Sequence, residues 1–288
     1  MKSCGCDRVE GKGRSMGLPG MCDSVETLTA KDVMQYGVIS VEKTEPVYRA
    51  VSLLLERNIS GLPVTSEGRL VGMISERDLL RVVHKNEYLP GQVGDYMSVQ
   101  VVSFDVDDPL ATISERLTRS AFRRVPVLLH QRTLAGIITR ADLIRFYKNR
   151  LYPAVAAGPK RELLAEDVMR RGLLTLTPGA PLAEAMDLIV RRHVTGIPVV
   201  DAEMKLLGII TEKDVLDYCL HPSPADATVA ALMTSSVVAF DRKTDLGLIC
   251  ECLITKDFHR VPVVDGGKLV GVISRSDILR SRATAFKR

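Results

Sequence analysis

The chain has 288 residues, of which 46% are hydrophobic and 26% are charged, so it can bury two cores and does not have the composition of a disordered protein. No run reaches the roughly 18 apolar residues of a membrane span. The N-terminal segment lacks the apolar core of a signal peptide, and we expect a cytoplasmic protein. The net charge of +4 is spread over scattered basic pairs, which argues against one nucleic-acid-binding face and allows anionic ligands.

Residues 1–30 are expected to form a flexible tail. They contain Cys4, Cys6 and Cys22, but no fourth cysteine or histidine lies nearby, and structural zinc takes four ligands. A glycine-rich stretch at 11–13 lacks the last glycine and the preceding strand of a dinucleotide-binding turn. We therefore predict no metal site here. Cysteines of a cytoplasmic protein are normally reduced thiols.

From residue 31 onward, a segment of about 60 residues occurs four times. In each copy a methionine is followed by a proline, then by a glycine and an aspartate. The four sets are Met34/Pro63/Gly72/Asp78, Met97/Pro126/Gly136/Asp142, Met169/Pro198/Gly208/Asp214 and Met233/Pro262/Gly271/Asp277. The steps from methionine to proline and from glycine to aspartate are identical in all four copies. Such constant spacing predicts a fold made of four copies of one unit.

Each copy predicts the same order of elements. A short apolar stretch, 38–41 in the first copy, precedes a helix whose first turn contains Pro46. Apolar residues at helical spacing predict that one face of this helix is buried. Two β-rich runs separated by a turn follow, 62–64 and 70–74, and a second helix opens at Ser75. The unit is β-α-β-β-α, and the fold class is α/β (α+β).

A unit of this size rarely buries enough apolar surface to be stable alone, so we expect the repeats to pair. The step from Met34 to Met97 is nearly as long as that from Met169 to Met233, but the step from Met97 to Met169 is longer than both. The extra length marks a linker. We predict a tail (1–30), repeat one (31–87), repeat two (93–150), a linker (151–163), repeat three (164–221) and repeat four (229–288).

The repeat motifs resemble those of the CBS-domain family (cystathionine β-synthase domains), in which two repeats form a Bateman module. The motifs are Gly-Leu-Pro-Val (61–64), Arg-Val-Pro-Val (124–127), Gly-Ile-Pro-Val (196–199) and Arg-Val-Pro-Val (260–263), with a Gly-x-Ile-Ser/Thr-x-x-Asp sequence at 72–78, 136–142, 208–214 and 271–277. The resemblance covers all of the chain except the tail. It implies two Bateman modules, which in this family commonly associate into discs, so the chain would close one disc or form a homodimer.

The Ser/Thr-x-x-Asp elements have two readings. A hydroxyl at the start of a helix, with an acid three residues later, is a helix cap. A capping box prefers Glu or Gln at the third position, however, and all four copies have Asp. A short carboxylate beside a helix N-terminus can accept two hydrogen bonds from a ribose diol, while the helix end attracts phosphate. We expect capping at all four elements and ribose binding at one or more of them.

The resemblance implies that adenine lies against the first strand and the residues before Pro-Val, and that a basic pair of the partner repeat contacts the phosphates. This predicts one strong cleft in each module. The first would combine Val38, Ile39, Ser60, Gly61, Leu62, Pro63, Ser75 and Asp78 with Arg123 and Arg124. The second would combine Leu173, Leu174, Thr195, Gly196, Ile197, Pro198, Thr211 and Asp214 with His259 and Arg260. The alternative is that the basic residues are solvated surface.

Two reciprocal clefts, built on Thr139/Asp142 and Ser274/Asp277, would face small residues instead of a basic pair. We expect them to be weaker sites, because they lack cationic partners. His259 has an ordinary pKa of about 6.5, so affinity in the second cleft should rise as the pH falls below neutrality.

The chain has no Walker A loop, nucleophile elbow or His-Glu-x-x-His helix, so we predict no enzymatic activity and no catalytic residues. The resemblance implies a regulatory protein that binds AMP, ADP, ATP or S-adenosylmethionine and signals to an unknown target protein. Two alternatives are a protein-interaction scaffold without ligand and a nucleic-acid-binding protein that uses the arginine pairs.

Overall fold

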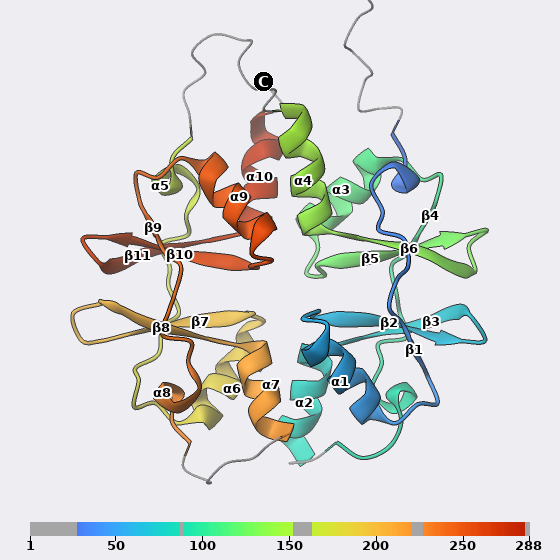
Figure 1. Cartoon of the computed structure of the whole chain (residues 1–288), viewed down its shortest axis with the longest axis horizontal. Helices are drawn as coiled ribbons and strands as arrows, with labels where there is room; N and C mark the ends of the chain where they lie inside the picture. The colour runs from blue at the N-terminus through green and yellow to red at the C-terminus, as the bar shows by residue number, and fades with distance from the viewer. Residues whose placement is uncertain (1–27, 87–88, 152–162, 221–226, 286–288) are drawn as a thin grey trace, which may run out of the picture.

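The computed structural model describes residues 28–86, 89–151, 163–220 and 227–285; the cysteine-containing tail lies outside the described residues. Four repeats with the predicted α/β organisation fill this part of the chain (Figure 1). Repeat one contains η2 (Ala30–Asp32), β1 (Val41–Glu42), α1 (Val47–Glu56), β2 (Gly61–Ser66), β3 (Arg69–Ser75) and α2 (Glu76–Asn86). Repeat two contains η3 (Val93–Asp95), β4 (Phe104–Asp105), α3 (Leu110–Arg119), β5 (Arg124–Leu129), β6 (Thr133–Thr139) and α4 (Arg140–Leu151).

The second half of the chain repeats this order. Repeat three contains α5 (Ala165–Val168), α6 (Leu182–Arg192), β7 (Gly196–Val200), β8 (Leu206–Thr211) and α7 (Glu212–Leu220). Its first strand is reduced to a parallel bridge between Leu176 and Val199. Repeat four contains α8 (Val229–Leu232), β9 (Phe240–Asp241), α9 (Leu246–Thr255), β10 (Arg260–Asp265), β11 (Lys268–Ser274) and α10 (Arg275–Ala285).

The first long helix of each repeat starts where the sequence places a residue suited to a helix N-terminus. Pro46, Pro109 and Pro181 directly precede α1, α3 and α6, where an N–H group is not needed. Repeat four has Asp245 at this place. Its carboxylate accepts hydrogen bonds from the backbone N–H groups of Gly247 (2.7 Å) and Leu248 (3.3 Å) and caps α9.

The segment around the methionine of each repeat packs on the hairpin of the partner repeat, not on its own. A Cβ atom added to Gly136 would lie 2.5 Å from the sulfur of Met34, and one added to Gly72 would lie 2.5 Å from that of Met97. The same contacts join Met169 to Gly271 and Met233 to Gly208. The predicted strand at 38–41 is therefore too long: the chain reaches its own hairpin only at Val41, which pairs with Val64.

The strands form one layer in each module. In the first, six strands run in the order β1-β2-β3-β6-β5-β4, and the two repeats meet where Arg69 of β3 pairs with Thr133 of β6. In the second, the hairpins β7-β8 and β10-β11 meet at a bridge between Lys205 and Lys268. The two predicted β-rich runs of each repeat form an antiparallel hairpin in both modules.

The hydrophobic cores are shared between the modules. One core contains apolar residues of repeats one and three, such as Leu80 and Leu216, and the other contains those of repeats two and four, such as Ile144 and Ile278. Helix α2 packs against α7 and α4 against α10, so the two modules face each other across the middle of the molecule (Figure 1). The described chain thus forms a single disc by itself, which is one of the two arrangements that the resemblance implies.

Candidate functional site

All four Ser/Thr-x-x-Asp elements cap the helices that follow them. The backbone N–H and the hydroxyl of Ser75 donate to Oδ2 of Asp78 at 3.0 and 2.6 Å. The matching pairs Thr139/Asp142, Thr211/Asp214 and Ser274/Asp277 make the same two bonds. Because capping uses Oδ2 in every repeat, Oδ1 is the oxygen that remains for a ligand.

The surroundings of Oδ1 divide the four acids into two classes. Oδ1 of Asp142 accepts from Gln35 (2.5 Å) and Arg145 (3.0 Å), and Oδ1 of Asp277 accepts from Arg170 (2.7 Å) and Arg280 (2.6 Å). In contrast, the only contact of Oδ1 of Asp78 within the described part of the chain is an ion pair with Arg81 at 3.9 Å. Among the described residues, no donor is within hydrogen-bonding distance of Oδ1 of Asp214.

The pKa values of Asp214 and Asp277 agree with this division. Burial raises the pKa of Asp214 above its ordinary value, although hydrogen bonds from Thr211 act in the opposite direction. Burial also disfavours the charged form of Asp277, but hydrogen bonds from Ser274, Arg170 and Arg280 outweigh it and lower the pKa. Arg170 and Arg280 thus stabilise the charged form of Asp277 by hydrogen bonds, whereas the one cation that acts on Asp214, Lys213, has a smaller effect than burial.

Asp142 and Asp277 share a cavity with residues of their partner repeats, whereas Asp78 and Asp214 do not line it, and this changes the predicted clefts. A cavity of about 590 Å³ brings together Val38, Ile39, Ser60, Gly61 and Pro63 with Thr139 and Asp142, and Leu173, Leu174, Thr195, Gly196 and Pro198 with Ser274 and Asp277. The predicted grouping of Val38, Ile39, Leu173 and Leu174 with Asp78 and Asp214 is wrong, because the segment after each methionine crosses to the partner's hairpin. In contrast, Gly61 pairs with Ser75 and Gly196 with Thr211 across their own hairpins, which agrees with the predicted grouping. Leu62 and Ile197 are fully buried in the core and line neither this cavity nor the next.

A second cavity of about 320 Å³ lies beside repeat three, and Asp214 is not among its lining residues. It brings Thr211 together with His259 and Arg260, as predicted, and Asp214 lies one turn along α7 from Thr211. The segment after Met233, residues 234 and 236–238, also lines it. The sequence analysis missed this segment, although the equal distance from each methionine could have identified it. In the first module the equivalent residue Ser98 pairs with Met73, on the strand that leads to Ser75 and Asp78.

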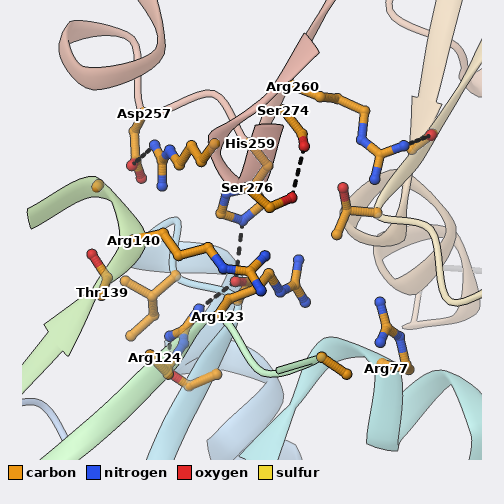
Figure 2. A pocket seen from close by; sticks show the side chains of 18 of the residues that line it. Arg77, Arg123, Arg124, Thr139, Arg140, Asp257, His259, Arg260, Ser274 and Ser276 are labelled. Carbon is orange, nitrogen blue, oxygen red and sulfur yellow. Dashed lines mark hydrogen bonds and ion pairs between the residues drawn. The ribbon is translucent and has the colours of Figure 1, made fainter. Parts of the chain in front are cut away.

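The larger cavity lies between the modules and is strongly cationic (Figure 2). Its lining includes the arginines Arg77, Arg123, Arg124, Arg140, Arg145, Arg170, Arg192, Arg260 and Arg275, against the aspartates Asp142, Asp257 and Asp277. The expectation that the clefts of Asp142 and Asp277 lack cationic residues is therefore wrong. Arg140 and Arg275 directly follow the capping Thr139 and Ser274, a position that the sequence analysis did not consider.

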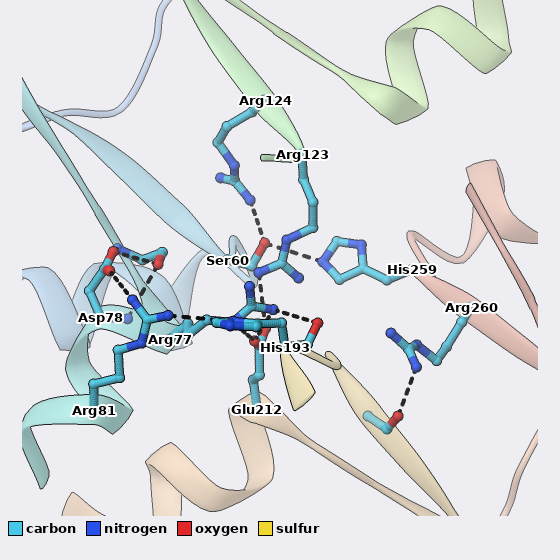
Figure 3. Close-up of polar contacts among 12 residues, drawn as sticks. Ser60, Arg77, Asp78, Arg81, Arg123, Arg124, His193, Glu212, His259 and Arg260 are labelled. Atoms are coloured by element: carbon cyan, nitrogen blue, oxygen red, sulfur yellow. Dashed lines mark hydrogen bonds and ion pairs between the residues drawn. The ribbon is translucent and has the colours of Figure 1, made fainter. Parts of the chain in front are cut away.

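Glu212, which lines the smaller cavity, joins the two modules (Figure 3). Its side chain is 2% exposed and forms ion pairs with Arg77 at 2.9 Å and Arg123 at 3.0 Å, both from the first module. Burying these charges is favourable only because they are paired. Of the predicted phosphate ligands, Arg123 is therefore bound to an acid, and its Nη1 atom is buried without a partner among the described residues.

Arg124 and Arg260 hold the pre-proline segments of the two modules. Arg124 donates to the carbonyl oxygen of Gly61 and to Oγ of Ser60, and Arg260 donates to the carbonyl oxygen of Gly196 at 3.0 Å. Nε of Arg260 is buried and has no partner within the described part of the chain. Since these arginines are partly or wholly enclosed, the alternative that they are solvated surface does not hold.

His259 lies beside the same arginines, with Nε2 3.2 Å from Oγ of Ser60 in the other module. Burial, followed by the positive charges of Arg123, Arg275, Arg124 and Arg260, lowers its pKa well below the ordinary value. His259 is therefore neutral near neutral pH, and the predicted dependence of affinity on its protonation is wrong in its premise.

Glu76 stands in repeat one where Glu212 stands in repeat three, but it has no ion pair with any described residue. Burial and the nearby Glu212 raise its pKa from 4.5 to about 7, against the attraction of Arg123, Arg124 and Lys213. The native state therefore holds a proton between about pH 4.5 and 7 that the unfolded state has lost. Stability should fall as the pH rises through this range.

We expect Glu76→Gln to increase the free energy of unfolding by up to about 3 kcal/mol at pH 8, because it removes a buried charge. The gain should shrink towards pH 5, where Glu76 is already protonated in the native state. Urea denaturation of both proteins at several pH values measures this difference. A gain of the same size at pH 5 and pH 8 would show that Glu76 does not titrate in this range.

Comparison with known proteins agrees with this geometry. The family model described as the CBS domain matches residues 30–85, 93–149, 165–221 and 229–284. The chain belongs to the CBS-domain family. Its four CBS repeats form two Bateman modules. Both cavities are lined by residues of more than one repeat and of both modules.

Several CBS-domain proteins are similar over long stretches. The uncharacterized protein MJ1225 of Methanocaldococcus jannaschii is 30% identical over 197 residues, covering 65% of this chain and 69% of that protein. Its crystal structure aligns with 88% of this chain and all of that chain, with a TM-score of 0.78 at 20% identity, which shows the shared fold. The 5′-AMP-activated protein kinase subunit gamma-3 of Bos taurus is 25% identical over 204 residues; the match covers 66% of this chain and 41% of that subunit.

Two further observations concern the described residues. None of their helices is long and apolar enough to cross a membrane. They also contain no cluster of three or more His, Cys, Asp or Glu side chains that could hold a metal ion.

Proposed function

We propose that this CBS-domain protein is a non-catalytic regulator that binds an adenine-containing ligand, namely AMP, ADP, ATP or S-adenosylmethionine, and transmits its occupancy to a partner protein. The observation that carries the proposal is the pair of acids Asp78 and Asp214. Each is held by a cap at a helix N-terminus, and each has an oxygen with room for a ligand. A ribose diol donates two hydrogen bonds, and such a carboxylate accepts them.

The basic residues support a phosphate-containing ligand. Thr211 shares a cavity with Arg260, whose Nε is buried without a partner in the described chain. Burying an arginine nitrogen without a hydrogen bond is costly, and a phosphate oxygen would satisfy it. The arginines face a cavity between the modules rather than an outer surface, which favours a small anion over a nucleic acid.

The path from ligand to partner runs through Glu212. Arg123, a proposed phosphate ligand in the first module, is ion-paired with Glu212, which directly follows Thr211 of the second. A phosphate that attracts Arg123 competes with Glu212 and alters the contact between the modules. A ligand shifts such an equilibrium by its difference in affinity between the two arrangements. The resulting change in the disc is what a partner protein would detect.

Ligand-dependent unfolding tests the proposal. At 100 times its dissociation constant, an adenylate should raise the free energy of unfolding by roughly 2.7 kcal/mol per site. Guanine and pyrimidine nucleotides serve as controls and should have much smaller effects. Thermal unfolding and calorimetric titration with AMP, ADP, ATP and S-adenosylmethionine measure this directly. No response to any adenine compound would refute the proposal and favour a ligand-free scaffold.

A further inference from the structure

The residue after the methionine of each repeat occupies the same backbone position four times. Gln35, Ser98, Arg170 and Thr234 each form an antiparallel bridge with the strand of the partner repeat, two residues before its capping Ser or Thr. Their backbone carbonyls accept hydrogen bonds of 3.0–3.1 Å from Ile137, Met73, Val272 and Ile209. Since the backbone is the same, the side chain alone decides what reaches the neighbouring acid.

The side chains at this position differ in length between the two halves of each module. Gln35 and Arg170 reach Oδ1 of Asp142 and Asp277, at 2.5 and 2.7 Å. Ser98 and Thr234 are short, and in the described structure neither forms a hydrogen bond with Asp78 or Asp214. One long and one short residue thus alternate from repeat to repeat.

The number of hydrogen bonds that a carboxylate can accept makes this difference in side-chain length decisive. An ionised carboxylate has about four lone-pair sites for hydrogen-bond donors. Asp142 already accepts four bonds, two from Thr139 and one each from Gln35 and Arg145. Asp277 likewise accepts two from Ser274 and one each from Arg170 and Arg280. Neither has room for two more bonds from a ribose diol.

Burial agrees with the hydrogen-bond count. The side chains of Asp142 and Asp277 are 3% and 6% exposed, whereas that of Asp78 is 19% exposed. Gln35 lies at the surface and the side chain of Arg170 is 64% exposed, so both cover their acids from the solvent side. A ligand entering from solvent would meet these residues first.

We infer that Gln35 and Arg170 act as built-in plugs of the Asp142 and Asp277 clefts, and that adenylate binds only in the Asp78 and Asp214 clefts. The inference rests on the proposed function and adds which of its clefts are in use. A ligand in a plugged cleft must first break the charge-assisted bond that Gln35 or Arg170 makes to Oδ1 of its acid, which weakens binding by roughly tenfold or more. The size of the residue after each methionine therefore selects the sites.

Exchanging the residues at this position tests the inference on the full chain. Gln35→Ser with Arg170→Thr copies the short residues of the other two repeats and should double the number of AMP molecules bound. The reciprocal variant, Ser98→Gln with Thr234→Arg, should remove the sites of the unaltered protein. Equilibrium dialysis with AMP gives the number of sites, and circular dichroism with urea unfolding verifies that each variant is folded.

A measurement without ligand accompanies the dialysis. Carboxyl titration by NMR should show a higher pKa for Asp277 in Arg170→Thr than in the unaltered protein, because one cationic donor is gone. Four AMP molecules bound to the unaltered chain, or an unchanged number in folded Gln35→Ser/Arg170→Thr, would overturn the inference while leaving the proposed function intact. Absence of binding of AMP, ADP, ATP and S-adenosylmethionine by both proteins would overturn both.

Discussion

The double substitution Asp78→Ala/Asp214→Ala is expected to weaken AMP binding by at least about 100-fold. Each alanine removes a carboxylate that would accept two charge-assisted hydrogen bonds from a ribose, and such bonds contribute roughly 1.5–3 kcal/mol each. Two such bonds contribute about 3 kcal/mol or more, and about 1.4 kcal/mol corresponds to a factor of ten in affinity, so the loss of affinity should be at least about 100-fold. Isothermal titration calorimetry of the full chain measures the effect.

Asp142→Ala/Asp277→Ala is the matched control for this experiment. It also removes two helix caps, each worth about 1 kcal/mol, so it separates lost stability from lost binding. We expect AMP affinity to change by less than about threefold, since these acids are occupied by Gln35, Arg145, Arg170 and Arg280. A larger loss of affinity in the control than in Asp78→Ala/Asp214→Ala would mean that the assignment of clefts is inverted.

Glu212→Ala is expected to lower the free energy of unfolding by about 3–5 kcal/mol. The substitution leaves Arg77 and Arg123 facing each other with their shared partner gone, and removing one member of a buried ion pair is strongly destabilising. Because both hydrophobic cores contain residues of both modules, the loss should appear as one shifted transition. Urea denaturation followed by circular dichroism measures it.

An exposed ion pair provides the control for Glu212. Glu115 and Arg119 are 58% and 70% exposed and lie 2.7 Å apart, and exposed pairs contribute only about 0–1 kcal/mol. Glu115→Ala should therefore change stability little. If Glu212→Ala were no more destabilising than Glu115→Ala, the contact between the modules would not depend on this ion pair.

The repeat spacing was sufficient to predict the fold class and the order of elements. The distances between methionine, proline, glycine and aspartate recur in all four copies, and each of these four residues has the same structural role in every repeat. Gly136 has no side chain because Met34 packs on it, and Pro63 stands in the strand that faces the cavity. Local periodicity predicted the helices for the same reason: each buries one face in a core.

The composition of the clefts could not be predicted in the same way. A repeat in the sequence suggests that its parts stay together in space, yet Val38 and Ile39 lie beside Thr139 of the next repeat. This exchange depends on the packing of Met34 against Gly136, which has no local signal in either segment. The charge of the central cavity was also missed, since Arg140 and Arg275 were not considered as candidate site residues.

The sharing of each core by both modules has a consequence for how the disc depends on dilution. A disc made of two separate single-module chains would dissociate as the protein concentration falls. Here both modules belong to one chain, so each finds its partner at an effective concentration that does not depend on the concentration of the protein. The cavity between the modules should therefore persist at nanomolar protein concentration. The fraction of sites occupied should then depend on the ligand concentration and not on the protein concentration.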